Sequence, residues 1–216
     1  MTQIIMQNIS KENVAKMKTE VFNGKIFVIN TPEDANKAAA FLEKQKILGI
    51  DTETRPSFKK GKVNKVALLQ IANDDMAFIF QLRFTGITET MKKILEAKNI
   101  VKVGLSLNDD IRALKGRRRF KPENFVELQT LVKKIGILDQ SLQKIYANLF
   151  GLKISKAKQL SNWNAQTLDN GQKKYAALDA VACVRIYRKV NRLIKSSDFI
   201  LQADISQDTE TTTQQQ

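Results

Sequence analysis

Two carboxylates separated by a single residue, Asp51 and Glu53, stand at the carboxyl end of the apolar run ILGIDTET. Side chains alternate along a strand, so both carboxylates would point to one face of a sheet, where their like charges repel. A divalent cation held between them would neutralise that repulsion. For an isolated Asp-x-Glu pair the commoner alternative is two solvated acids just beyond the end of the strand.

Two further segments carry acids that could join the same site. Asp109 and Asp110 follow the apolar run IVKVGLSLN at the start of a predicted helix, where Asp is favoured as an N-cap. We expect Asp109 to be capping or solvated and Asp110 to be functional. Tyr175 and Asp179 lie four residues apart on one face of a long predicted helix, in the Ala-rich run YAALDAVAC. An acid packed within such a helix needs a cation or hydrogen-bond partners.

The composition excludes several kinds of catalysis. Histidine is absent and cysteine occurs once, at Cys183. An intrachain disulfide, the usual zinc sites and nucleophilic catalysis with an imidazole base are therefore excluded. Any chemistry must use carboxylates, lysine, tyrosine or a metal held by oxygen, and hard oxygen ligands favour Mg²⁺ or Mn²⁺. A tyrosine, whose ordinary pKa is about 10, suits an orienting role better than that of a base.

The charge balance favours a polyanionic partner. The 216 residues include 36 Lys and Arg against 22 Asp and Glu, a formal net charge of +14. Such a charge on a globular domain indicates nucleic acid, although a merely solvated basic surface is the alternative. No apolar run approaches the roughly 20 residues of a membrane span, and the first ten residues lack the order of a secretory signal. We expect a cytoplasmic protein without membrane association, and no protein partner can be inferred.

The order of the predicted elements is typical of an α/β domain. Strands alternate with helices in the first half of the chain, helices dominate the second half, and this pattern favours a mixed sheet. The Asn-Asp-Asp turn at residues 73–75 predicts an antiparallel hairpin. Strands are expected at residues 25–29, 47–54, 66–72, 76–80 and 100–104, and helices at about 32–45, 89–98, 108–114, 129–135, 140–150 and 171–194.

Three sequence blocks in fixed order carry a family resemblance. They are Gly49-Ile-Asp51-Thr-Glu53, Val103-Gly104 leading to Asp110, and Tyr175-Ala-Ala-Leu-Asp179, with VALLQIA and LSNW as flanking text. Over roughly residues 25–195 the chain resembles the DEDD superfamily of 3′-to-5′ exonucleases, in the tyrosine-containing branch with ribonuclease D and the Werner-type exonuclease domains. Each motif alone is weak, but their order and separations make the combined match specific.

The resemblance implies a fold, an activity and a set of site residues. The fold would be ribonuclease-H-like, a mixed β-sheet flanked by α-helices. Asp51, Glu53, Asp110 and Asp179 would hold two divalent ions, Mg²⁺ or Mn²⁺, and Tyr175 would help to place the attacking water. The activity would be 3′-to-5′ hydrolysis of DNA or RNA from single-stranded or frayed ends. The alternative is a non-catalytic nucleic-acid-binding module that retains the fold.

Basic residues follow the first two blocks and could contact the phosphates of a strand without sequence preference. Arg55 stands in a Thr-Arg-Pro segment where eukaryotic Werner-type domains have Trp-Pro. Phe58 could stack on a terminal base or pack beneath its own loop. The residues expected to bind nucleic acid are Arg55, Phe58, Lys59, Lys60, Lys62, Arg117, Arg118 and Arg119, with Lys65, Lys115 and Lys121 nearby.

We expect three regions along the chain. Residues 1–24 would form a helical or loosely ordered arm, and residues 25–196 the exonuclease domain. Residues 197–216 would form a polar tail, whose end, SQDTETTTQQQ, is too polar to pack and is expected to be disordered.

Overall fold

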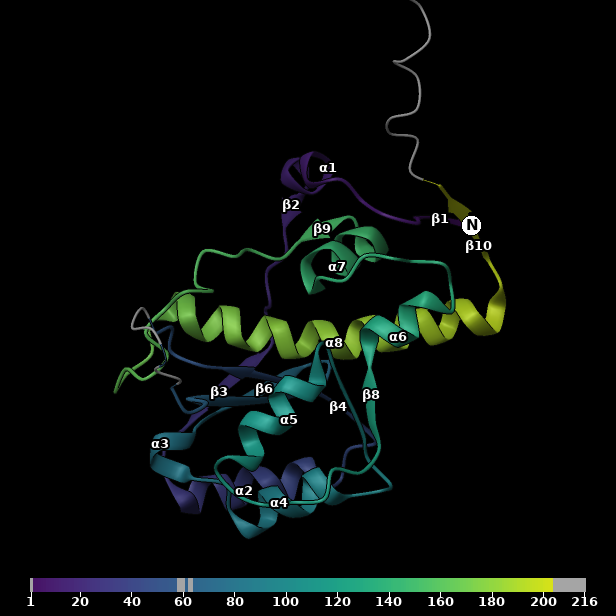
Figure 1. The fold of residues 1–216 in the computed structure, drawn as a ribbon. Helices are drawn as coiled ribbons and strands as arrows, with labels where there is room; N and C mark the ends of the chain where they lie inside the picture. Colours follow the sequence, from purple (N-terminus) through teal and green to yellow (C-terminus); the bar gives the residue numbers. More distant parts are fainter. Residues whose placement is uncertain (1, 58–60, 62–63, 204–216) are drawn as a thin grey trace, which may run out of the picture.

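A six-stranded mixed sheet forms the centre of the protein (Figure 1). The structure, a computed structural model, describes residues 2–57, 61 and 64–203. The strand order is β3-β6-β5-β4-β7-β8, in which β5 is antiparallel to β4 and β6 and the other neighbours are parallel. The predicted hairpin and the mixed sheet are confirmed. The strands are β3 (Lys25–Ile29), β4 (Ile47–Glu53), β5 (Leu68–Ala72), β6 (Met76–Gln81), β7 (Val101–Gly104) and β8 (Phe125–Glu127).

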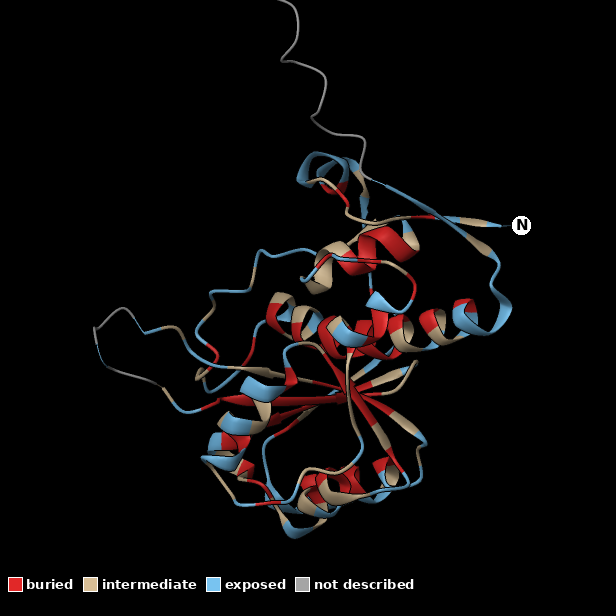
Figure 2. Cartoon of the chain, turned by 45° about the vertical axis from the view of Figure 1, so that its right-hand side comes forward, coloured by how far each residue is buried: buried red, intermediate tan, exposed pale blue. Residues whose placement is uncertain are grey.

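Helices cover both faces of this sheet, which gives the α/β layers that the sequence predicts. The long helix α8 crosses one face, and α6 and α7 lie on the same side (Figure 1). Helices α2 and α4 cover the opposite face, and the strands between the two layers are largely buried (Figure 2). The helices are α2 (Pro32–Leu42), α3 (Leu82–Thr85), α4 (Glu89–Glu96), α5 (Leu107–Lys115), α6 (Leu128–Lys133), α7 (Leu142–Phe150) and α8 (Asn170–Ser196). Within the described residues, no helix has the length and apolarity that crossing a membrane requires.

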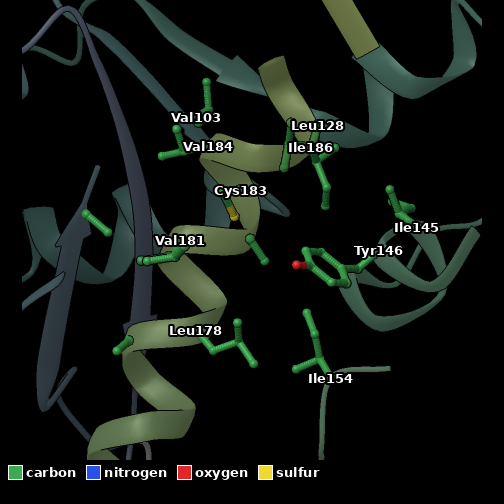
Figure 3. Packing of buried hydrophobic residues seen from close by; sticks show 14 of the residues in the cluster. Val103, Leu128, Ile145, Tyr146, Ile154, Leu178, Val181, Cys183, Val184 and Ile186 are labelled. Carbon is green, nitrogen blue, oxygen red and sulfur yellow. The ribbon is translucent and has the colours of Figure 1, made fainter. Parts of the chain in front are cut away.

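Alternation along β4 and β5 sends successive side chains into different cores. Leu48 and Ile50 pack toward α2 and α4, together with Leu69 from the neighbouring strand. Leu68 belongs to the core beneath α8. Figure 3 shows that second core, where apolar side chains of α8 meet residues of α6, α7 and β7. This alternation places the odd-numbered residues of β4 beneath α8.

A glycine lets α8 approach β4 closely. A Cβ atom added at Gly49 would lie 1.9 Å from the carbonyl oxygen of Ala180. This distance is too short for any side chain, so only glycine fits here. The helix itself begins with a capping box, in which Asp169 accepts from the backbone of Gln172 and the Gln172 side chain accepts from the backbone of Asp169. The start of the helix and its close contact with β4 together fix the height of its side chains above the sheet.

The N-terminal segment, expected to be helical or loosely ordered, contains a short helix and two short strands. These are β1 (Gln3–Met6), α1 (Lys11–Lys16) and β2 (Lys18–Thr19). Strand β1 pairs in parallel with β10 (Phe199–Gln202), and β2 pairs with β9 (Leu152–Lys153). The polar tail therefore does not begin at residue 197, because the apolar segment Phe199-Ile-Leu supplies a pairing strand.

Buried polar contacts hold this segment against the helical layer. The backbone N–H of Ile9 donates to the buried carboxylate of Asp139 at 3.0 Å. The Tyr146 hydroxyl donates to Glu20 at 2.8 Å and accepts from Arg185 of α8 at 3.0 Å. These contacts connect the N-terminal segment to α7, to the residues just before it and to α8.

Candidate active site

Three carboxylates from two elements meet beneath α8. Asp51 and Glu53 lie on the same face of β4 at its carboxyl end, and Asp179 projects from α8 above them. Each offers a carboxylate oxygen, and these oxygens lie within 4.8 Å of one another. Asp51 and Glu53 are half-buried, and Asp179 is only 6% exposed. The alternation along β4 and the close packing at Gly49 produce this arrangement.

Asp110, the fourth acid expected at the site, lies beside this group of three. Its Oδ1 accepts a hydrogen bond from the Thr52 hydroxyl at 2.5 Å. Thr52 separates Asp51 and Glu53 in the sequence, so a residue on the other face of the strand fixes the fourth acid. The neighbouring Asp109 is solvated, as expected, and forms an exposed ion pair with Arg112 at 3.2 Å.

Burial raises the pKa values of all four acids, and the charges of neighbouring acids add to this increase for Asp51, Glu53 and Asp110. Burial, followed by the charges of Asp179 and Asp110, raises the pKa of Glu53 to about 9. Burial raises the pKa of Asp179 to about 7 and that of Asp110 to about 6, while hydrogen bonds from Tyr175 and Thr52 respectively oppose these increases. The pKa of Asp51 is raised well above its usual range by burial and by its three acidic neighbours. Without a cation, the folded site therefore disfavours the ionised forms of these acids.

The donor set fits a hard divalent cation. It consists of carboxylate oxygens with no histidine or thiolate ligand, and positive charge between them would remove the repulsion that raises the pKa values of Asp51 and Glu53.

A buried amide side chain, that of Gln70 on the neighbouring strand β5, lies next to these acids. Gln70 pairs directly with Asp51, and neither its amide nitrogen nor its amide oxygen has a hydrogen-bond partner within the described structure. The only sign of this residue in the sequence is one amide within the apolar run VALLQIA.

Glu127, at the end of β8, positions the helix that carries Asp110. Its two carboxylate oxygens accept from the backbone N–H groups of Ser106 and Leu107 at 3.0 and 2.8 Å. Ser106 takes a left-handed conformation, with φ of 59°, and makes no side-chain cap of its own. Helix α5 is therefore capped by an acid twenty residues further along the chain, whereas capping was expected from Asp109. The short strand β8 carried no periodic signal from which Glu127 could be found.

Tyr175 lies one turn before Asp179 and hydrogen-bonds to its carboxylate. The half-buried ring packs against Trp163, with ring centroids 5.9 Å apart. Trp163 is buried and belongs to the LSNW segment that flanks the third sequence block. Burial, with the charges of Asp179 and Glu53, raises the pKa of Tyr175, so its hydroxyl stays protonated at neutral pH. Tyr175 is thus a fixed hydrogen-bond donor at the edge of the carboxylate group.

Only some of the residues expected to bind nucleic acid after the first sequence block belong to the described residues. Arg55 is exposed two residues after Glu53, and its carbonyl oxygen accepts from the Asn64 side chain at 2.8 Å. Lys65 is also exposed. The other residues expected here lie outside the described residues: Phe58, Lys59, Lys60 and Lys62.

The second basic cluster mostly holds the protein together. Arg117 donates to the carbonyl oxygens of Val66 and Leu82 at 2.6 and 3.1 Å. Arg118 donates to the carbonyl of Ile87 at 2.7 Å and also pairs with Glu89. Both guanidinium groups are therefore directed into the fold, and Arg119 is the exposed member of the three. Lys121 forms an ion pair with Glu123 at 2.9 Å, and Lys115 lies over the Phe120 ring.

Comparison with known proteins identifies the family. Residues 26–195 match the family model described as 3′-5′ exonuclease. The chain is 31% identical over 153 residues to the mouse bifunctional 3′-5′ exonuclease/ATP-dependent helicase WRN, a match that covers 68% of this chain and 11% of that protein. It is 26% identical over 165 residues to ribonuclease D of Gluconacetobacter diazotrophicus, covering 74% of this chain and 41% of that protein.

A solved structure agrees on the fold. The exonuclease domain of Aedes aegypti Nibbler is similar with a TM-score of 0.76 at 18% identity, covering 84% of this chain and 95% of that one. The chain spans less than half the length of the two curated relatives described above. The ribonuclease-H-like architecture and the family resemblance expected from the three sequence blocks are confirmed. The chain belongs to the 3′-5′ exonuclease family.

Proposed function

We propose that this protein is a metal-dependent 3′-to-5′ exonuclease that removes nucleotides from the 3′ end of DNA or RNA. The observation that carries the proposal is the convergence of Asp51, Glu53 and Asp179 within 4.8 Å, with a hydrogen-bonded tyrosine at their edge. Asp110 lies beside them, fixed by Thr52. A fold that served only for binding would have no chemical need for acids that repel one another.

These four acids would hold two divalent ions, Mg²⁺ or Mn²⁺. When bound, such ions lower the pKa of a coordinated water and stabilise charge on the phosphoryl and departing oxygens. In the reaction, a water oxygen forms a bond to phosphorus while the bond to the 3′ oxygen breaks. The products are a nucleoside 5′-monophosphate and a strand shorter by one nucleotide, which carries the water-derived proton on its new 3′ hydroxyl.

The chain's own residues orient this reaction. Asp179 is held by the Tyr175 hydroxyl, and both lie on one face of α8. Because the raised pKa keeps Tyr175 protonated, the phenol does not act as the base. Its single O–H donates to Asp179, so its oxygen would accept from the attacking water and orient it. Exposed Arg55, immediately beyond the acids, would contact a phosphate of the bound strand.

Nuclease assays on end-labelled oligonucleotides test the proposal. Single-stranded DNA and RNA of equal sequence, labelled at the 5′ end, are incubated with the parent protein in Mg²⁺, in Mn²⁺ or in chelator. We expect a ladder that shortens by one nucleotide at a time in metal, and no products in chelator. Comparing DNA with RNA identifies the preferred sugar. Strand binding without products in either metal would contradict the proposal and indicate a non-catalytic nucleic-acid-binding module.

A further inference from the structure

A basic surface lies at the carboxyl end of α8, away from the carboxylate site and toward the yellow end of the helix in Figure 1. We call it the basic groove and define it by Ile47, Tyr187, Arg188, Arg192 and Lys195, which line a hollow of about 650 Å³. Ile47 and Tyr187 are half-buried and supply apolar surface, whereas the three cations are exposed. A smaller hollow of about 320 Å³ shares Arg192 with it and is also lined by Lys189 and by one acid, Asp198. The groove thus combines an aromatic ring with exposed positive charge.

The positive charge of this surface is largely unpaired. The segment from Ala180 to Ser197 contains five cations and no acid. Arg188 pairs with Asp74 at 2.9 Å, and Arg185 pairs with Glu20 at 3.5 Å. Among the ion pairs within 4.0 Å that the described residues form, none involves the remaining three cations, which are Lys189, Arg192 and Lys195.

Helix stability alone does not account for this cluster. A helix dipole favours cations in its last turn, which explains Lys195 but not the cations one and two turns earlier. Burial and the charge of Arg192 lower the pKa of Lys189, so like charges stand close together along the helix. Unpaired like charges beside an aromatic ring are complementary to a phosphate backbone with stacked bases.

The basic groove is remote from the carboxylates. Arg192 follows Asp179 by thirteen residues, which is about 20 Å along an α-helix. Ile47 opens β4, whereas Asp51 and Glu53 close it, so the strand gives a separation of roughly 13 to 20 Å. A single-stranded segment of several nucleotides is long enough to reach both places.

We propose that the basic groove binds the sugar-phosphate backbone of a nucleic acid and anchors the strand whose 3′ end lies at the carboxylates. Arg192 and Lys195 would contact phosphates, and the Tyr187 ring would offer a surface for a base. This inference rests on the proposed function for its ligand. It can nevertheless be tested without hydrolysis, so the two proposals can fail separately.

Binding measurements in chelator with matched charge reversals test the groove. The test variant is Arg192→Glu with Lys195→Glu. The control is Lys16→Glu with Lys93→Glu, which changes the net charge equally at exposed cations of α1 and α4. Affinity for fluorescent oligonucleotides of about 20 and about four nucleotides is measured over a range of salt concentrations. A milder variant, Arg192→Gln with Lys195→Gln, and melting curves for all variants separate lost contacts from lost folding.

We expect the groove reversal to weaken binding of the long oligonucleotide roughly tenfold more than the control reversal does. Losing two contacts should reduce the slope of log affinity against log salt by about 1.4. The short oligonucleotide, too short to span both surfaces, should distinguish the two variants far less. Equal effects of the groove and control reversals on the long oligonucleotide would overturn the proposal. Binding of all variants to vesicles of anionic phospholipid is measured in parallel. If the groove reversal weakened binding to the vesicles but not to the oligonucleotides, the proposal would also be overturned and the surface would be assigned to a membrane.

Discussion

The Tyr175 hydroxyl donates a hydrogen bond to the carboxylate of Asp179, one turn further along α8. The bond links the residue proposed to orient water with the most deeply buried acid of the site. It favours the ionised form of Asp179, while burial opposes ionisation and raises the pKa of that carboxyl to about 7. One helix thus supplies both an acid and the donor that keeps the acid in place.

Removing only this oxygen in Tyr175→Phe should lower kcat and kcat/KM together, by a factor of roughly 10² to 10⁴. The ring stays, so its packing against Trp163 and the melting temperature should change little. Steady-state kinetics on a labelled single strand in Mn²⁺ provides the measurement. If the variant kept full kcat, or lost only substrate affinity, Tyr175 would be a packing or binding residue.

Replacing Glu127 tests the support for Asp110. Glu127→Ala removes the acceptor of two backbone N–H groups at the start of α5 and of one at the start of α6, that of Gln129. We expect a loss of roughly 1 to 2 kcal/mol in the free energy of unfolding, and the lost support for Asp110 should also lower activity. Glu127→Gln, which keeps one acceptor oxygen, should lose less of both. Asp109→Asn is the matched control on α5, because its ion pair with Arg112 is exposed. Chemical denaturation and nuclease rates measure the effects, and equal behaviour of Glu127→Ala and the control would refute the capping role.

The pH dependence of stability tests the electrostatics of the site. The folded pKa values of Asp110, Asp179 and Glu53 are raised to about 6, 7 and 9, so the folded state binds more protons than the unfolded chain above about pH 4. The metal-free protein should therefore lose stability as the pH rises from about 5 to about 8. Above pH 8 the buried amine of Lys102, whose pKa is lowered to about 8, acts in the opposite direction. Denaturant midpoints of dialysed protein measure this slope, and saturating Mn²⁺ should flatten it. A metal-free stability that rises with pH in this window would show that the acids are not crowded.

Replacing Gln70 tests what a buried amide without hydrogen-bond partners costs in stability. Its amide is completely buried beside Asp51 and lacks hydrogen bonds to the described residues. Gln70→Met keeps a similar volume and removes two uncompensated polar atoms, so the metal-free protein should gain about 1 kcal/mol of stability. Gln81→Met is the control, because the Gln81 amide donates to the carbonyl of Ala165 at 3.1 Å and should cost stability when lost. Destabilisation of equal size by both changes would mean that Gln70 has partners in solution.

The central elements could be predicted from the sequence because their signals are local. The apolar strand that ends in Asp51 and Glu53, and the long helix with Tyr175 and Asp179, are visible in periodicity and in the three ordered blocks. Their convergence depends on the contact of Gly49 with Ala180, which follows from tertiary packing. The glycine stood in the first block, but its partner could not be read from the sequence.

The parts that sequence analysis missed are short and stabilised over long range. Strands β1 and β10 lie almost two hundred residues apart and, among the strands of the described residues, pair only with each other, so neither end of the chain reveals the pairing. Glu127, at the end of β8, caps the distant helix α5, and Arg117 donates to backbone carbonyl oxygens. Residue type alone could not distinguish these roles from that of a solvated surface charge. A basic cluster in sequence is ambiguous until the partners of each cation are known.

The measurement that tests the central claim most directly is the rate at which Asp51→Asn releases nucleotides from a 3′ end in saturating Mn²⁺. The account predicts a rate at least roughly 10³-fold below that of the parent, because a ligand of the carboxylate site is lost. The metal-free variant should be as stable as the parent or about 1 kcal/mol more stable, since one repelling charge is gone, and Mn²⁺ should raise its melting temperature far less than that of the parent. Parent-like nucleotide release by a folded Asp51→Asn protein would contradict the account and place the chemistry elsewhere.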